Sequence, residues 1–208
     1  GRILLLEKEF SAAIPKLKQQ YKAKPSDQNV TFLAYALEGN NQKNAAIELL
    51  ERHSTEYGLQ PRTSLSLANL YLSTDKNKAI NEYEKLIKIQ PNNIVLLNNI
   101  SWLYMEKKLF YQALTHARKA YSLSAEVPNV VDTYALILLK SGDKVEALVK
   151  AELAYKLSKA EDVDIALNFA EVLLANNDKV RAREVLLAIT TETKVQKTKH
   201  QQLIEQSK

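Results

Sequence analysis

Apolar residues recur along the chain with helical spacing, in a pattern that repeats about every 34 residues. Each repeat has an alanine near the start of an apolar stripe, and successive alanines lie 33, 33, 34, 34 and 35 residues apart. They are Ala13, Ala46, Ala79, Ala113, Ala147 and Ala182. A stripe of helical period predicts an amphipathic helix, and a fixed period of this length predicts a repeat architecture.

A second helical pattern precedes each stripe and ends in a short polar turn. Residues 33–37 lead into Gly39-Asn40-Asn41, and residues 134–138 lead into Ser141-Gly142-Asp143. Such turn residues favour left-handed or capping conformations, and proline ends one helix before the next begins. The prolines between pairs are Pro25, Pro61, Pro91 and Pro128. The pattern therefore predicts an all-α fold of helix-turn-helix hairpins in series.

These hairpins resemble the tetratricopeptide repeat (TPR) family. The matching residues are Leu67, Ala68, Tyr71, Ala79, Tyr83, Leu86 and Pro91 in one repeat, and Leu97, Ile100, Ser101, Tyr104, Ala113, Ala117 and Ala120 in the next. The resemblance extends over about nine-tenths of the chain and implies a right-handed α-solenoid of about five and a half TPR hairpins. Four features depart from the family pattern: a turn one residue short after Tyr71, Lys108 in place of the turn glycine, and His53 and Gln20 at usually small packing positions.

The TPR resemblance also predicts the division of the chain. We expect a TPR array over residues 1–192, with a first repeat truncated at its N-terminus, so that the chain continues a longer array. Residues 193–208 are expected to form a basic C-terminal capping helix or tail, because they carry four lysines against Glu205, a net charge of +3. A solvated cap is the favoured role for these lysines over contact with phosphates or anionic lipid.

Composition narrows the function further. The chain has no cysteine and only four glycines, each isolated, which excludes thiol chemistry and glycine-rich phosphate loops. The histidines His53, His116 and His200 lie far apart, so we expect no metal site. The acidic group Glu161-Asp162-Asp164 precedes a helix, where capping is its expected role. We therefore expect no enzyme activity, no cofactor and no catalytic residue, and no apolar run is long enough to span a membrane.

Partner binding is the function that the TPR resemblance implies, on a concave groove lined by first-helix positions. The candidate partner-binding residues are Tyr35, Asn69, Leu72, Asn98, Trp102, Met105, Asp132 and Leu136. Tryptophan gives a large contact area, and amide side chains can pair with main-chain groups of a bound protein segment. Alternatively, Trp102, Leu136 and Leu139 simply pack between neighbouring first helices. The groove lacks the lysine or arginine beside asparagine with which some TPR modules clamp a terminal carboxylate.

The leading prediction is a non-catalytic scaffold for protein–protein interaction. Residues 97–104, 116–121 and 131–134 also look like bacterial TPR lipoproteins linked to exopolysaccharide export and PEP-CTERM sorting, which implies a periplasmic address in the cell envelope, although a cytoplasmic one stays open. Alternatives are an interaction domain of a larger enzyme, a polymer-binding repeat, and self-association through the truncated first repeat. Nucleic acid is disfavoured because the predicted groove carries acidic residues and no lysine or arginine.

Overall fold

The structure is a computed structural model that describes all 208 residues except the side chain of Arg2. Over these residues the chain forms 13 α-helices and no β-strand, which confirms the predicted all-α repeat fold. The helices are α1 (Arg2–Leu6), α2 (Phe10–Ala23), α3 (Asp27–Gly39), α4 (Lys43–Tyr57), α5 (Pro61–Tyr71), α6 (Lys76–Ile89), α7 (Ile94–Glu106), α8 (Phe110–Leu123), α9 (Pro128–Ser141), α10 (Lys144–Leu157), α11 (Val163–Ala175), α12 (Lys179–Ala188) and α13 (Lys194–Gln206).

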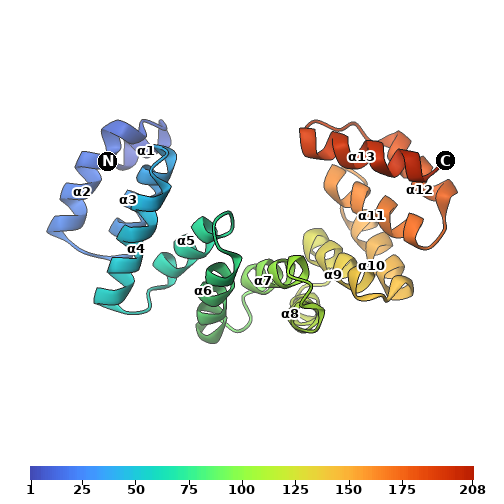
Figure 1. Cartoon of the computed structure of the whole chain (residues 1–208), viewed down its shortest axis with the longest axis horizontal. Coiled ribbons are helices and arrows are strands. Elements are labelled where there is room, and N and C mark those ends of the chain that lie inside the picture. The colour runs from blue at the N-terminus through green and yellow to red at the C-terminus, as the bar shows by residue number, and fades with distance from the viewer. The chain divides into compact units, whose positions relative to one another are not determined.

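The helices form two compact units, one over Gly1–Pro91 and one over Asn92–Lys208. Within each unit, an odd-numbered first helix pairs with the even-numbered second helix that follows it (Figure 1). Consecutive first helices also pack side by side, as α3 does on α5, α7 on α9 and α9 on α11. The helix α13 packs on α11 and α12 in the place of a further first helix.

The repeated alanines lie where the two helices of each hairpin meet. All six, from Ala13 to Ala182, are completely buried. A side chain larger than a methyl group at these positions would push the paired helices apart or force neighbouring side chains out of their rotamers. The alanine repeat therefore sets how closely each second helix approaches its neighbours.

The turns within the hairpins are closed by one recurring backbone hydrogen bond. In five of the six turns an N–H donates to the carbonyl five residues earlier, as Gln42 does to Leu37 and Leu109 to Tyr104. The loop that this bond closes contains a residue with positive φ in each case; they are Lys8, Asn41, Lys108, Gly142 and Asn177. After α5 the turn is one residue shorter: Asp75 donates to the carbonyl of Tyr71, and no residue from 72 to 75 has positive φ.

Polar side chains and prolines mark the helix starts. Pro61 and Pro128 occupy the first helical positions of α5 and α9, where no N–H is needed. Asp162 accepts hydrogen bonds from the N–H groups of Asp164 and Ile165, which confirms the capping role expected for it. A capping box between Thr193 and Gln196 begins α13.

Gly39 supplies a test of close packing in the first unit. A Cβ built on Gly39 would lie 2.6 Å from carbon atoms of the Phe10 ring. We expect Gly39→Ala to lower the free energy of unfolding by about 1–3 kcal/mol, even though alanine favours helix, because the clash outweighs that gain. Urea denaturation measures the change. In a Phe10→Leu background the loss should shrink, and a Gly39→Ala variant that is more stable than wild type would contradict this packing.

Candidate functional site

Three of the predicted partner-binding residues lie in the first unit. Tyr35 on α3 is exposed and packs edge to face on Phe10, with ring centroids 5.6 Å apart. Asn69 on α5 is exposed, and its Oδ1 accepts a hydrogen bond from the buried Tyr83 at 3.0 Å. Leu72 is partly exposed at the end of α5. These residues line the first helices as expected, but Asn69 and Tyr35 already have partners within the unit.

The other five lie in the second unit, on the neighbouring first helices α7 and α9. Asn98 and Trp102 are one helical turn apart on α7, so their side chains share one face of that helix. Asp132 and Leu136 have the same spacing on α9. Asn98 and Asp132 occupy equivalent positions of successive repeats, 34 residues apart. Because α7 packs on α9, the two helices bring these pairs to one side of the unit.

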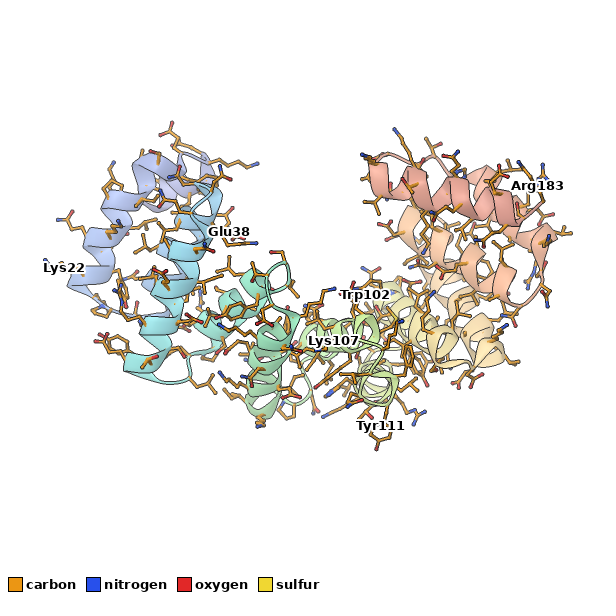
Figure 2. All side chains as sticks on the ribbon, viewed as in Figure 1. Lys22, Glu38, Trp102, Lys107, Tyr111 and Arg183 are labelled. Atoms are coloured by element: carbon orange, nitrogen blue, oxygen red, sulfur yellow. The ribbon has the colours of Figure 1, made fainter. Side chains whose placement is uncertain are left out.

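Exposure separates the apolar members of this group. Trp102 is 41% exposed, which leaves a large part of the indole open to contact. It lies on the opposite side of the α7–α8 hairpin from Tyr111, which is exposed on α8 (Figure 2). Met105 and Leu136 are buried, so these two side chains belong to the packing of the unit. The alternative considered for Leu136, packing within the array, matches its position in the structure.

Two buried acceptor atoms belong to the position one helical turn before Trp102 on α7 and to the equivalent position on α9. The Oδ1 atom of Asn98 is buried and has no hydrogen-bond partner among the described residues. The same is true of the Oδ1 atom of Asp132, a residue that is only 9% exposed. Leaving a buried acceptor unpaired costs about 1–3 kcal/mol, and more for a charged group. Two acceptors that lack a donor therefore lie at equivalent positions of adjacent first helices.

The second carboxylate oxygen of Asp132 belongs to a polar network that crosses three first helices. Asn168 on α11 donates to Asp132 Oδ2 at 2.7 Å, and Lys199 on α13 donates to Asn168 Oδ1 at 2.6 Å. Lys199 also pairs with Glu171 at 2.8 Å, and Lys140 of α9 donates to the other Glu171 oxygen at 2.5 Å. The network ties α9, α11 and α13 together and holds the Asp132 carboxylate in one orientation.

The pKa values of the two acids in this network shift in opposite directions. Burial raises the pKa of Asp132 to about 7, because the Asn168 hydrogen bond and the more distant Lys199 only partly oppose it, and Asp162 and Asp164 add to the rise. Burial would also raise the pKa of Glu171, but hydrogen bonds from Lys140 and Lys199 outweigh burial and lower it. Asp132 is thus the member of the network that lacks a direct cationic partner.

The residues that hold Asp132 were not predicted from the sequence. Lys199 was expected to be a solvated residue of the basic tail, but in the structure it contacts Asn168 and Glu171. His53, at its packing position, is fully buried, its Nδ1 lies 2.9 Å from the Tyr21 hydroxyl, and burial lowers its pKa.

Within the described part of the chain, no cluster of three or more histidine, cysteine or acidic side chains is arranged to hold a metal ion. The described helices also include none with both the length and the apolar character needed to cross a bilayer.

Comparison with solved structures identifies the fold. A tetratricopeptide repeat protein from Parabacteroides merdae superposes over 99% of this chain and 86% of its own, with a TM-score of 0.81 and 15% identity. The chain has the TPR fold. A thermophilic TPR protein from Thermus thermophilus aligns with a TM-score of 0.66 and 18% identity, over 86% of this chain and 100% of its own. YrrB, a TPR protein with an unusual peptide-binding site, aligns with a TM-score of 0.66 and 14% identity, over 90% of this chain and 91% of its own.

At these identities the likeness extends to the TPR fold alone. No protein-family model matches the sequence, and no curated protein matches it. Among the predicted partner-binding residues, Asn98, Trp102 and Asp132 combine an exposed aromatic side chain with acceptors that have no hydrogen-bond partner among the described residues.

The raised pKa of Asp132 predicts a specific dependence of stability on pH. From about pH 4 to 7 the folded TPR unit keeps a proton that the unfolded chain releases, so the free energy of unfolding falls as pH rises. Asp132→Asn removes this titration. We expect wild type to lose about 2–4 kcal/mol more than the variant between pH 4.5 and 8, measured by urea denaturation. Parallel losses in the two proteins would show that Asp132 titrates normally.

Proposed function

We propose that this chain is a non-catalytic TPR scaffold that binds a segment of a partner protein on the first-helix face of its second unit. The observation that carries the proposal is the pair of buried, unpartnered acceptors on α7 and α9 beside the exposed Trp102. No other group of predicted partner-binding residues in the described structure combines open acceptors with an exposed aromatic side chain.

A polypeptide supplies what these groups lack. Each main-chain N–H of a bound segment is a hydrogen-bond donor, and a segment that crosses α7 and α9 can offer one N–H to Asn98 and another to Asp132 in its ionised form. Trp102 gives the apolar contact area that anchors many protein interfaces. A buried acceptor without a hydrogen bond raises the free energy of the unbound protein. Pairing that acceptor in the complex removes this cost and so favours binding.

The raised pKa of Asp132 also occurs among catalytic acids, but its surroundings favour recognition. One oxygen is fixed by Asn168, and the neighbouring Glu171 is held between Lys140 and Lys199. The described residues include no metal cluster near it, and the chain has no cysteine nucleophile. The peptide-binding site of the similar TPR protein YrrB supports a binding role on this fold.

Peptide selection tests the proposed site. Random peptides displayed on phage are selected against the chain, and the affinities of labelled winners are measured by fluorescence anisotropy. Trp102→Ala should weaken binding at least about tenfold, because a central aromatic anchor is lost, and Asn98→Ala and Asp132→Asn should weaken it several-fold. Trp102 is the only tryptophan, so its emission should change when peptide binds to wild type.

Tyr111→Ala is the matched control for this experiment, since it removes an exposed aromatic side chain from the other side of the α7–α8 hairpin. It should leave peptide affinity unchanged. Circular dichroism and thermal melting establish that each variant is folded. Selected peptides that bind all three site variants as tightly as wild type would refute the proposed site.

The wider context of the scaffold is also a proposal. We propose that it works within an assembly of the bacterial cell envelope, on the basis of the resemblance of residues 97–104, 116–121 and 131–134 to TPR lipoproteins of exopolysaccharide export. Fractionation of source cells tests this address. Recovery with the periplasm or membranes is expected, and recovery in the cytosol alone would contradict it.

A further inference from the structure

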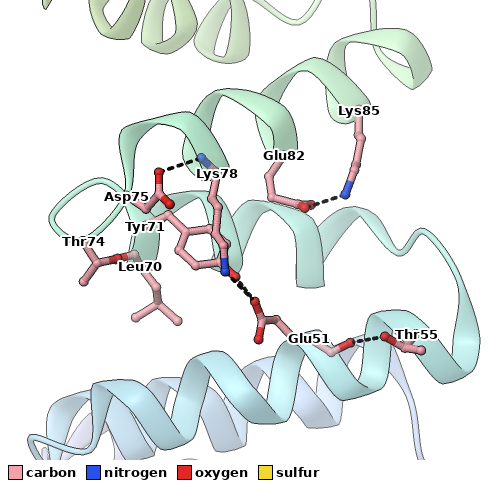
Figure 3. Close-up of polar contacts among 9 residues, drawn as sticks. All are labelled: Glu51, Thr55, Leu70, Tyr71, Thr74, Asp75, Lys78, Glu82 and Lys85. Carbon is pink, nitrogen blue, oxygen red and sulfur yellow. Dashed lines mark hydrogen bonds and ion pairs between the residues drawn. The ribbon is translucent and has the colours of Figure 1, made fainter.

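A polar pocket lies in the first unit, between the helices α4, α5 and α6, and none of the residues predicted to bind a partner lines it. Its volume is about 420 Å³, within the range of ligand-binding clefts. Glu51 on α4 and Glu82 on α6 both line the pocket. The Glu51 side chain extends from α4 toward the α5–α6 hairpin, and the Glu82 carboxylate points toward Lys85 (Figure 3). The other polar residues of the lining are Lys78, Lys85, Tyr71, Asn81, Ser54 and Thr55.

Glu82 is the buried acid of this pocket. It is only 7% exposed, and its Oε1 accepts a hydrogen bond from Lys85 at 2.6 Å. Its Oε2 is buried and has no partner among the residues described by the structure. An ionised carboxylate normally accepts hydrogen bonds at both oxygens, and a desolvated oxygen without a donor is unfavourable. Glu82, which lines the pocket, therefore has one buried oxygen that lacks a donor.

Lys78, the other lysine of the pocket, is hydrogen-bonded to the other acid, Glu51. Lys78 donates to Glu51 Oε1 at 3.2 Å and stands 5.1 Å from the centre of the Tyr71 ring. The Tyr71 hydroxyl donates to the same Glu51 oxygen. These hydrogen bonds, first that of Tyr71 and then that of Lys78, lower the pKa of Glu51, so this acid is ionised at neutral pH. The pocket thus holds two carboxylates, each with its own lysine, and one acceptor that neither lysine uses.

We infer that this pocket binds a guanidinium group, an arginine side chain of a partner protein. Lys78 and Lys85 each pair with a carboxylate, so the charges that line the pocket balance, and the atom left unpaired is an acceptor, which calls for a ligand with hydrogen-bond donors. A guanidinium brings five N–H donors in a planar fork, which can reach Glu82 Oε2 and still satisfy neighbouring acceptors. Charge-assisted hydrogen bonds to a desolvated carboxylate are among the stronger polar contacts in proteins.

This site goes beyond the proposed function, because it lies in the other unit and faces the side built from the second helices α4 and α6. It would add a second point of contact, selective for arginine, to the scaffold. The proposal depends on Glu82 and on the positive charge of the ligand, and both can be varied separately.

N-acetyl-arginine amide is the probe, titrated into the whole chain labelled with ¹⁵N and followed by amide chemical shifts. We expect saturable shifts confined to α4, α5 and α6. N-acetyl-citrulline amide, which keeps the shape but not the charge, should bind at least fivefold more weakly. Glu82→Gln should weaken arginine binding at least tenfold, whereas Glu48→Gln, the same charge change at an exposed position of α4, should leave it unchanged.

Lys85→Gln guards against a loss that merely reflects damaged folding. This substitution frees Glu82 Oε1 from its lysine partner and removes a competing cation. Arginine should therefore bind several-fold more tightly, a gain that misfolding cannot produce. The proposal is overturned if no saturable shift occurs, if Glu82→Gln binds arginine as wild type does, if citrulline binds equally well, or if Lys85→Gln weakens binding.

Discussion

The close approach of helices at the buried alanines is the constraint on which the rest of the structure depends. Each second helix can meet its first helix only because residues such as Ala79 and Ala113 present a methyl group and nothing larger. The separation between paired helices also limits how closely consecutive first helices, such as α9 and α11, can pack on one another. Asp132 on α9 and Asn168 on α11 are in contact at 2.7 Å across two such first helices.

Helices and turns were predictable because their signals are local. The period of about 34 residues and the polar turns gave the hairpins, and the short turn after Tyr71 was visible as a missing residue. Lys108 illustrates why a residue-type rule is incomplete here. It adopts the left-handed backbone conformation expected of glycine, because the turn bond between Leu109 and Tyr104 requires that geometry whichever residue is present.

The candidate site was only partly predictable, because burial depends on neighbours that are distant in sequence. Their positions in the repeat placed Asn98, Trp102, Met105 and Leu136 together among the predicted partner-binding residues. In the structure, Trp102 is exposed, whereas Met105 and Leu136 are buried. The partners of Asp132 could not be derived from repeat spacing either. Asn168 lies next to the equivalent position rather than on it, and Lys199 comes from a helix outside the regular repeats.

The unpaired acceptors on α7 and α9 also determine how the surrounding medium should act on recognition. Surface ion pairs such as Lys140–Glu171 lie partly in water, where dissolved salt weakens them. Asn98 Oδ1 and Asp132 Oδ1 are removed from water before any partner arrives, so mobile ions have little access to them. A complex formed through these two atoms would therefore hold nearly the same affinity in dilute and in concentrated salt, which suits a scaffold that works where ionic conditions vary.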